Sequence, residues 1–303
     1  FVYTEAMNQG LTPCDKRRDE YISMEVYDKK KNEMTTWRPT NANGTFTGDS
    51  MPLKTAFARS INSVAVRLGQ EMGIKRIIAT AEAMGIKSPL DDTPSLALGS
   101  SDVTLLELTN AYCTIANNGI HHEPVLVTRI VDKDGNEIYL DRSQAEQVIP
   151  YKSAFLVQQL LQGGLREPGG TSMSLWGYVA NFRDTDFGGK TGTSNNHSDA
   201  WFECVSPNLV VGAWVGGEYR SIHFRTGALG QGSRTALPIT GYFLNAVLSD
   251  PAFKKYRGRF KKPEKGDNIT ADMYTCQSYY KAAKKDTLQN DSLETVSVEE
   301  VNL

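Results

Sequence analysis

Gly188-Gly189-Lys190-Thr191-Gly192-Thr193-Ser194 is a stretch rich in glycine and hydroxyl groups, and two apolar runs, 199–205 and 209–215, follow it closely. Apolar runs of this length are typical of β-strands. Apolar residues recur at helical spacing in other parts of the chain, such as 53–68 and 151–162. The mixture of strand and helix signals predicts an α/β or α+β architecture.

The polar side chains of this stretch are poor material for a hydrophobic core. Side chains two positions apart in a strand share one face, so Thr191 and Thr193 should point together and Lys190 the opposite way. Gly192 has no side chain and leaves the backbone open to close approach by another group. We therefore expect a strand edge that binds a ligand.

Composition limits the classes of function. The chain has 303 residues, with 33 Lys and Arg against 35 Asp and Glu, so its charge gives no reason to expect nucleic-acid binding. No apolar run approaches the roughly 18 residues of a membrane-spanning helix, and the first residues given do not have the pattern of a signal peptide. The sequence begins with Phe1 rather than Met, and we expect it to be part of a longer chain.

The four cysteines lie far apart and form no metal-binding or redox pair. Cys113 lies in a helical pattern and Cys204 in a strand pattern, which favours buried free thiols. His121 and His122 are adjacent in a predicted strand and should diverge. We expect neither a metal site nor a cofactor, and the cysteines do not indicate the redox compartment.

A helix is predicted to open near residue 49 or 50, with Pro52 in its first turn. Ser60-Ile61-Asn62 lies inside this helical stretch. On a continuous helix Ser60 and Asn62 would point about 200° apart and could not serve one site. A break at this point, with Asn62 capping a second helix up to Gly73, would bring them together. The alternative is that both are ordinary residues of a helix surface.

The remaining elements follow from local signals. Thr104 and Glu107 have the spacing of a capping box, and Asp134-Gly135 separates two short runs as in a hairpin. Residues 11–48 are polar and predict a long surface connection, and 286–303 have little to bury and predict a poorly ordered tail. Other predicted helices cover 1–10, 74–84, 105–119, 151–162 and 237–248.

Gly189-Lys190-Thr191 also suggests a phosphate-binding loop. That motif requires a glycine where this chain has Asp184, and a helix rather than strands should follow it. The alternative is the K-T-G element of penicillin-recognising serine enzymes, which accompanies S-x-x-K and S-x-N elements. S-x-N occurs at Ser60, Ser194 and Ser206. Order and helical context select Ser60-Ile61-Asn62.

With these motifs, the chain resembles the transpeptidase domain of class A, bifunctional penicillin-binding proteins. The resemblance covers roughly residues 1–250. It also includes Ala97-Leu98-Gly99-Ser100-Ser101 and Asp199-Ala200-Trp201-Phe202, and the general pattern of 53–68, 105–119 and 210–216. It implies the penicillin-binding and serine β-lactamase type of fold, an antiparallel sheet flanked by helices. We expect a transpeptidase domain over 1–256 and a polar, partly disordered extension over 257–303.

The resemblance implies a role for each site residue. Ser60 would relay a proton to the leaving amine, Asn62 would orient the substrate amide, and Lys190 would supply positive charge near Ser60. Thr191 and Thr193, with Gly192 between them, would bind the terminal carboxylate of a peptidoglycan stem peptide, and the backbone N–H of Thr193 would stabilise the oxyanion. β-Lactam antibiotics would bind as mimics of the D-alanyl-D-alanine terminus.

One element of the family is missing from its expected position. The family places the S-x-x-K nucleophile just before the helix that Phe1 continues, so we expect this chain to lack it. The one S-x-x-K match, Ser278-Tyr279-Tyr280-Lys281, follows the K-T-G element, which is the wrong order. Class A membership implies an upstream glycosyltransferase domain, a membrane anchor, and a location on the outer face of the bacterial cytoplasmic membrane. A D,D-carboxypeptidase, a serine β-lactamase and a non-catalytic scaffold remain alternatives.

Overall fold

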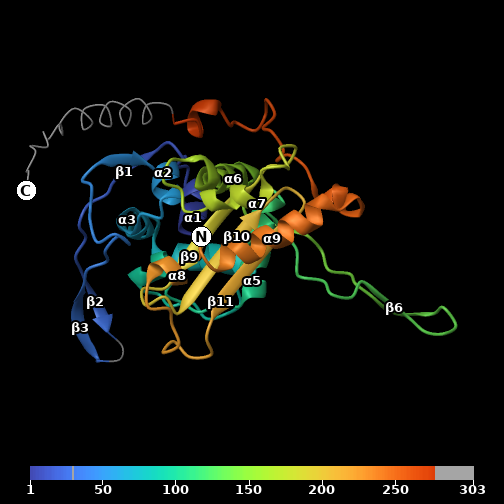
Figure 1. The fold of residues 1–303 in the computed structure, drawn as a ribbon, viewed down its shortest axis with the longest axis horizontal. Coiled ribbons are helices and arrows are strands. Elements are labelled where there is room, and N and C mark those ends of the chain that lie inside the picture. Colours follow the sequence, from blue (N-terminus) through green and yellow to red (C-terminus); the bar gives the residue numbers. More distant parts are fainter. Residues whose placement is uncertain (29–30, 277–303) are drawn as a thin grey trace, which may run out of the picture.

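The computed structural model describes residues 1–28 and 31–276 of the chain (Figure 1). Its central sheet has three antiparallel strands, β9 (Gly188–Thr193), β10 (Asp199–Val205) and β11 (Val210–Gly216), in the order β11-β10-β9. The predicted strands are confirmed, and β9 forms one edge of this sheet. That edge strand carries the Lys-Thr-Gly-Thr sequence.

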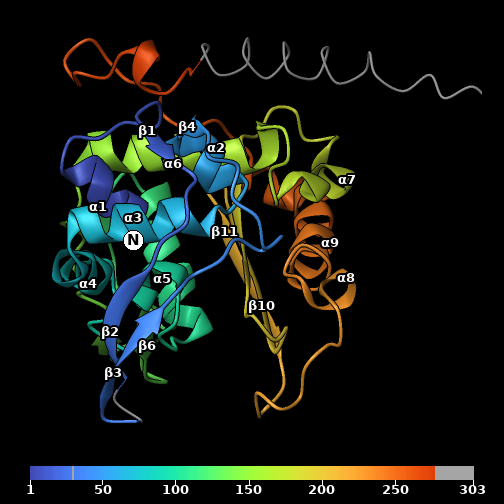
Figure 2. The ribbon, with the colours of Figure 1, turned by 90° about the vertical axis from the view of Figure 1, so that its left-hand side faces the viewer.

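Helices cover both faces of the sheet, as Figure 2 shows with the sheet seen nearly edge-on. One core cluster joins the sheet to most of the longer helices, and its fully buried residues include Leu156 and Leu160. The second cluster packs Phe202 and Cys204 of β10 against the last helix of the core, α9. The predicted antiparallel sheet flanked by helices is therefore confirmed. The helices are α1 (Val2–Asn8), α2 (Leu53–Ala58), α3 (Asn62–Met72), α4 (Ile74–Ala83), α5 (Leu105–Ala116), α6 (Tyr151–Arg166), α7 (Trp176–Val179), α8 (Gly227–Gly230) and α9 (Ala236–Ser249).

The polar segment 11–48 is more regular than predicted. It contains an antiparallel pair, β2 and β3, and a strand, β1, that pairs with β4 just before α2. The helix predicted from residue 49 or 50 begins only at Leu53, because 50–52 form β4. The smaller strands are β1 (Lys16–Arg18), β2 (Met24–Asp28), β3 (Glu33–Trp37), β4 (Ser50–Pro52), β5 (Ile120–His121), β6 (Arg129–Val131), β7 (Glu137–Leu140) and β8 (Glu146–Gln147).

The last described residues return to the helical core. Phe260 is buried, and the ring of Tyr274 lies 5.3 Å from the ring of Phe155 on α6 in an edge-to-face arrangement. A disulfide joins Cys14 to Cys276, a pairing that the sequence alone did not indicate. The tail predicted for 286–303 lies outside the described residues, and so does the S-x-x-K match at Ser278. The boundary at residue 256 stays a prediction.

The predicted capping box at the start of α5 is confirmed. The Thr104 hydroxyl accepts from the backbone N–H of Glu107, and the Glu107 carboxylate accepts from the backbone N–H of Thr104. We expect Thr104→Ala to lower the free energy of unfolding by about 1 kcal/mol, because the backbone N–H of Glu107 loses the hydroxyl oxygen that accepts from it. Chemical denaturation measures this, with Thr128→Ala at an exposed position as control. Equal stability of the two variants would contradict the capping role.

Candidate functional site

A sharp break separates α2 from α3 at the position that the sequence indicated. The backbone N–H of Ser60 donates to the carbonyl of Phe57, and that of Ile61 donates to Ala56, which closes the end of α2. Ser60 has a φ of 56°, in the left-handed region that few non-glycine residues adopt. This conformation stops the helix and leaves Ser60 in a tight turn between the two helices.

Lys190 on β9 reaches this turn. Its Nζ donates to the Ser60 Oγ at 2.9 Å and to the carbonyl of Thr191 at 2.7 Å. The Phe57 ring lies 5.9 Å from the same Nζ, at a distance suited to a cation–π contact. Burial lowers the pKa of Lys190 to about 8. Two residues that are 130 positions apart in the sequence, Ser60 and Lys190, are thus hydrogen-bonded to each other.

The two threonine hydroxyls are bound by different segments. Thr191 Oγ1 donates to Thr171 Oγ1 at 2.7 Å, and Thr193 Oγ1 accepts from the backbone N–H of Gly232 at 3.1 Å. The backbone N–H of Thr171 also donates to the carbonyl of Ala58, which connects this segment to the end of α2. The segments after α6 and before α9 therefore flank the polar residues of β9.

Gly232 could not be replaced by a larger residue without moving this loop. A Cβ at this position would lie 2.5 Å from the carbonyl oxygen of Gly192 and 2.3 Å from that of Trp201. The loop at Gly232 therefore passes close to the carbonyl group of Gly192. Sequence reasoning missed both Thr171 and Gly232, although the Gly169-Gly170-Thr171 and Gly230-Gln231-Gly232 stretches could have marked them as tight backbone positions.

The structure does not place Asn62 as the sequence suggested. The residue before it, Ile61, is the cap of α3 and provides no side-chain hydrogen bond, so the predicted capping by Asn62 is wrong. The Asn62 side-chain amide instead donates to the carbonyl of Thr40 at 2.8 Å. No described contact joins it to Ser60 or Lys190. Its role in the site stays a prediction.

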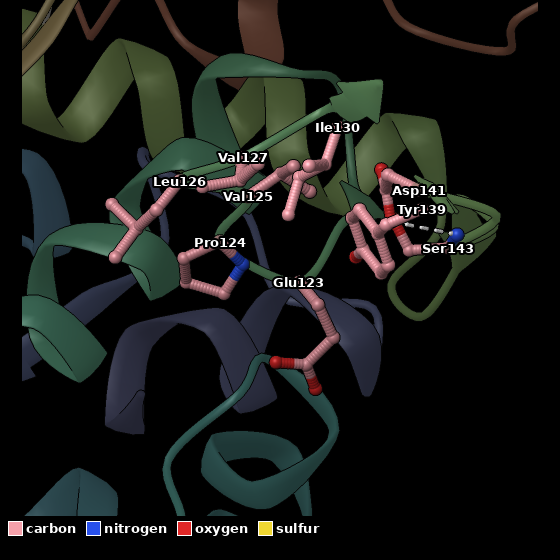
Figure 3. A pocket seen from close by; sticks show the side chains of 9 residues that line it. All are labelled: Glu123, Pro124, Val125, Leu126, Val127, Ile130, Tyr139, Asp141 and Ser143. Carbon is pink, nitrogen blue, oxygen red and sulfur yellow. Dashed lines mark hydrogen bonds between the residues drawn. The ribbon is translucent and has the colours of Figure 1, made fainter. Parts of the chain in front are cut away.

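A cavity of about 400 Å³ lies away from these residues, beside the hairpin of β6 and β7 (Figure 3). Its lining includes Leu126, Val127, Ile130 and Tyr139, and it contains none of the predicted site residues. Over residues 1–28 and 31–276, no group of three or more His, Cys, Asp or Glu side chains could hold a metal ion. The polar groups around Lys190 are thus the better candidate for a functional site.

The arrangement has a definite chemical capacity. A lysine with a lowered pKa, hydrogen-bonded to a serine hydroxyl, can pass a proton to or from a group next to that serine. Hydroxyl groups beside a sheet edge can bind a carboxylate while the strand pairs with a peptide backbone. Together these groups can hold the end of a peptide and protonate an amine that leaves it.

Comparison with known proteins identifies relatives of this arrangement. The family model "Penicillin binding protein transpeptidase domain" matches residues 17–202. Penicillin-binding protein 1A of Rickettsia typhi is 31% identical over 91% of this chain and 36% of its own length. That of Aquifex aeolicus is 33% identical over 81% of this chain and 32% of its own length. The chain spans about a third of the curated relatives that it matches.

A solved structure supports the same relationship. The crystal structure of penicillin-binding protein 1A from Haemophilus influenzae superposes with a TM-score of 0.74 at 25% identity, over 88% of this chain and 42% of that one. The mycobacterial PonA1 structure has a TM-score of 0.68 at 21% identity over 89% of this chain and 71% of that one, which shows the shared fold. None of the helices in the described ranges has the length and apolar character needed to cross a membrane.

Proposed function

Because the chain belongs to the penicillin-binding protein transpeptidase domain family, we propose that it is the substrate-binding and proton-relay part of a D,D-transpeptidase. The observation that carries this proposal is the hydrogen bond from Lys190 to Ser60 beside the hydroxyl-bearing strand β9. The substrate is a peptidoglycan stem peptide that ends in D-alanyl-D-alanine. β-Lactams bind at the same place as mimics of that dipeptide.

The donor peptide lies along β9 in this proposal. Its terminal carboxylate accepts hydrogen bonds from Thr191 and Thr193. The Thr191 hydroxyl must turn its proton from Thr171, whereas the Thr193 hydroxyl accepts from Gly232 and keeps its own proton to donate. Gly192 between them permits close approach of the peptide. The backbone N–H of Thr193 donates to the carbonyl oxygen that becomes negatively charged, a type of contact whose removal elsewhere raises the barrier by about 3 kcal/mol.

Ser60 and Lys190 control the transfer of a proton to the leaving amine. In the first step the ester bond to the attacking serine forms, the amide bond between the two alanines breaks, and the leaving amine takes a proton through Ser60. Lys190 holds the Ser60 oxygen in place and supplies positive charge next to it. Asn62 would orient the substrate amide once its side-chain amide has exchanged the hydrogen bond to the Thr40 carbonyl for one to the substrate. In the second step the acceptor amine forms the new amide, the ester breaks, and the serine oxygen regains a proton.

The attacking serine comes from outside the 303 residues in this proposal. Their one S-x-x-K match, at Ser278, follows the Lys-Thr-Gly element in the wrong order. A class A parent would also contribute a glycosyltransferase domain and a membrane anchor that hold the domain on the outer face of the bacterial cytoplasmic membrane. Transfer to water, as in a carboxypeptidase or a β-lactamase, uses the same groups, and a non-catalytic scaffold needs none of them.

Labelling with a fluorescent penicillin tests the proposal. The intact parent should give a labelled band on a denaturing gel. The 303-residue chain alone should give none, because in this proposal it lacks the serine to which the penicillin becomes covalently attached. Circular dichroism of the short chain verifies that it is folded. A labelled band from the short chain would contradict the proposal and return attention to Ser278. An unlabelled but folded parent would favour the scaffold.

A further inference from the structure

A second cavity, of about 530 Å³, lies between α7 and the start of α9. These two helices lie side by side in both ribbon views (Figures 1 and 2) and pack against each other. The cavity is lined chiefly by Ser174, Tyr178, Ser233, Arg234, Leu237 and Pro238. Its volume is within the usual range for sites that bind small molecules or parts of larger ligands.

The walls of this cavity continue directly from the candidate site. Ser174 lies three positions after Thr171, whose hydroxyl accepts the hydrogen bond from the Thr191 hydroxyl. Ser233 follows at once after Gly232, whose backbone N–H holds the Thr193 hydroxyl. The two segments that flank the threonines of β9 therefore run on to form opposite sides of the cavity. The chain on each side of the cavity is thus continuous with a residue that contacts a threonine hydroxyl of β9.

The polar lining favours a negatively charged group. Arg234 is the charged residue of the lining, it is exposed, and no carboxylate of the described residues forms an ion pair with it. The hydroxyls of Ser174, Tyr178 and Ser233 add hydrogen-bond donors around it. A guanidinium beside hydroxyl groups matches a carboxylate, which it can bind through two parallel hydrogen bonds.

The geometry of acyl transfer determines which carboxylate reaches the cavity. The acceptor amine attacks the carbonyl carbon from which the D-alanine amine has departed, so the acceptor occupies the side that the leaving residue held. In the proposed function the carboxylate of that leaving residue lies at Thr191 and Thr193. The body of the acceptor therefore extends past these threonines toward the cavity. Resting on the proposed function, we propose that the cavity binds a carboxylate of the acceptor stem peptide through Arg234.

Acceptor kinetics of the intact parent test this inference. The probes are a stem peptide with its free carboxylates and the same peptide as carboxamides, each offered with one D-alanyl-D-alanine donor. We expect Arg234→Leu to raise the KM for the carboxylate acceptor about tenfold or more, as for loss of a charged hydrogen bond, and to leave the KM for the carboxamide acceptor unchanged. Arg142→Leu, at an exposed position before β8, should change neither.

Penicillin acylation separates this inference from the proposed function. A penicillin carries no acceptor, so Arg234→Leu should acylate at the wild-type rate, and a thermal melt should show that the variant is folded. A slower acylation would place Arg234 on the donor and overturn the acceptor assignment. Equal KM changes for both acceptors, or none, would also overturn it. Wild-type parent that fails to acylate at all would overturn the proposed function, and with it the inference.

Discussion

Lys190→Ala should slow penicillin acylation of the intact parent by about two to three orders of magnitude. The alanine removes both hydrogen bonds of the Nζ, to the Ser60 hydroxyl and to the carbonyl of Thr191. It also removes the positive charge closest to the serine that relays the proton. Stopped-flow acylation with a chromogenic cephalosporin measures the rate, and Lys54→Ala, another lysine with a lowered pKa but on α2, is the matched control.

The pH dependence of the wild-type rate tests the same role. Burial lowers the pKa of Lys190 to about 8, so the side chain is charged below that pH and becomes neutral above it. If the charge assists the reaction, the acylation rate should fall as the pH rises through about 8. Lys190→Arg keeps its charge at all these pH values and should lose this inflection. Full labelling of Lys190→Ala, or a rate that rises through pH 8, would refute the assigned role.

The local elements of this fold could be predicted because their signals are local. The strands β9, β10 and β11 follow from short apolar runs, and the start of α5 follows from the spacing of Thr104 and Glu107. A break at Ser60 could be named only as one of two alternatives, and the turn that forms it does not bring Asn62 into contact with Ser60. These features depend on residues a few positions apart, where periodicity and capping rules are reliable.

Pairings between distant segments could not be obtained in this way. Thr171 meets Thr191, and Gly232 meets Thr193, only because α6 and α9 pack on the sheet and bring their flanking segments to β9. The amide of Asn62 is held by Thr40, from a segment that the sequence described only as a surface connection. The disulfide of Cys14 with Cys276 likewise joins two ends of the chain. The spacing of these residues in the sequence does not predict that they are in contact in the folded chain.

Glu203 is the most unexpected residue of the sheet. It lies on β10 in register with Lys190, yet its side chain is directed to α5, where the Thr109 hydroxyl donates to its Oε1 at 3.2 Å. Only 2% of the residue is exposed, and its other oxygen, Oε2, has no hydrogen-bond partner among the described residues. Gly212 on β11 leaves room for this carboxyl group, since a Cβ there would lie 2.6 Å from Oε1.

This burial makes the stability of the domain depend on pH. Removal from water disfavours the charged form and raises the pKa of Glu203 to about 8, against an ordinary value near 4.5. Between these two values the folded chain keeps a proton that the unfolded chain has lost. The contribution of Glu203 to stability is therefore present below pH 4.5 and is lost progressively as the pH rises to 8, by about 5 kcal/mol in total.

Glu203→Gln should abolish this loss. Glutamine has the shape of the protonated acid, so the variant and the wild type should have similar free energies of unfolding at pH 5. At pH 8 the variant should be more stable by several kcal/mol, because it has no carboxyl group whose ionisation favours the unfolded chain. Urea denaturation at both pH values measures the difference, and Glu146→Gln, at an exposed position of β8, should show none. A Glu203→Gln variant that is less stable than the wild type at pH 8 would mean that the buried carboxylate is charged and paired in the folded protein.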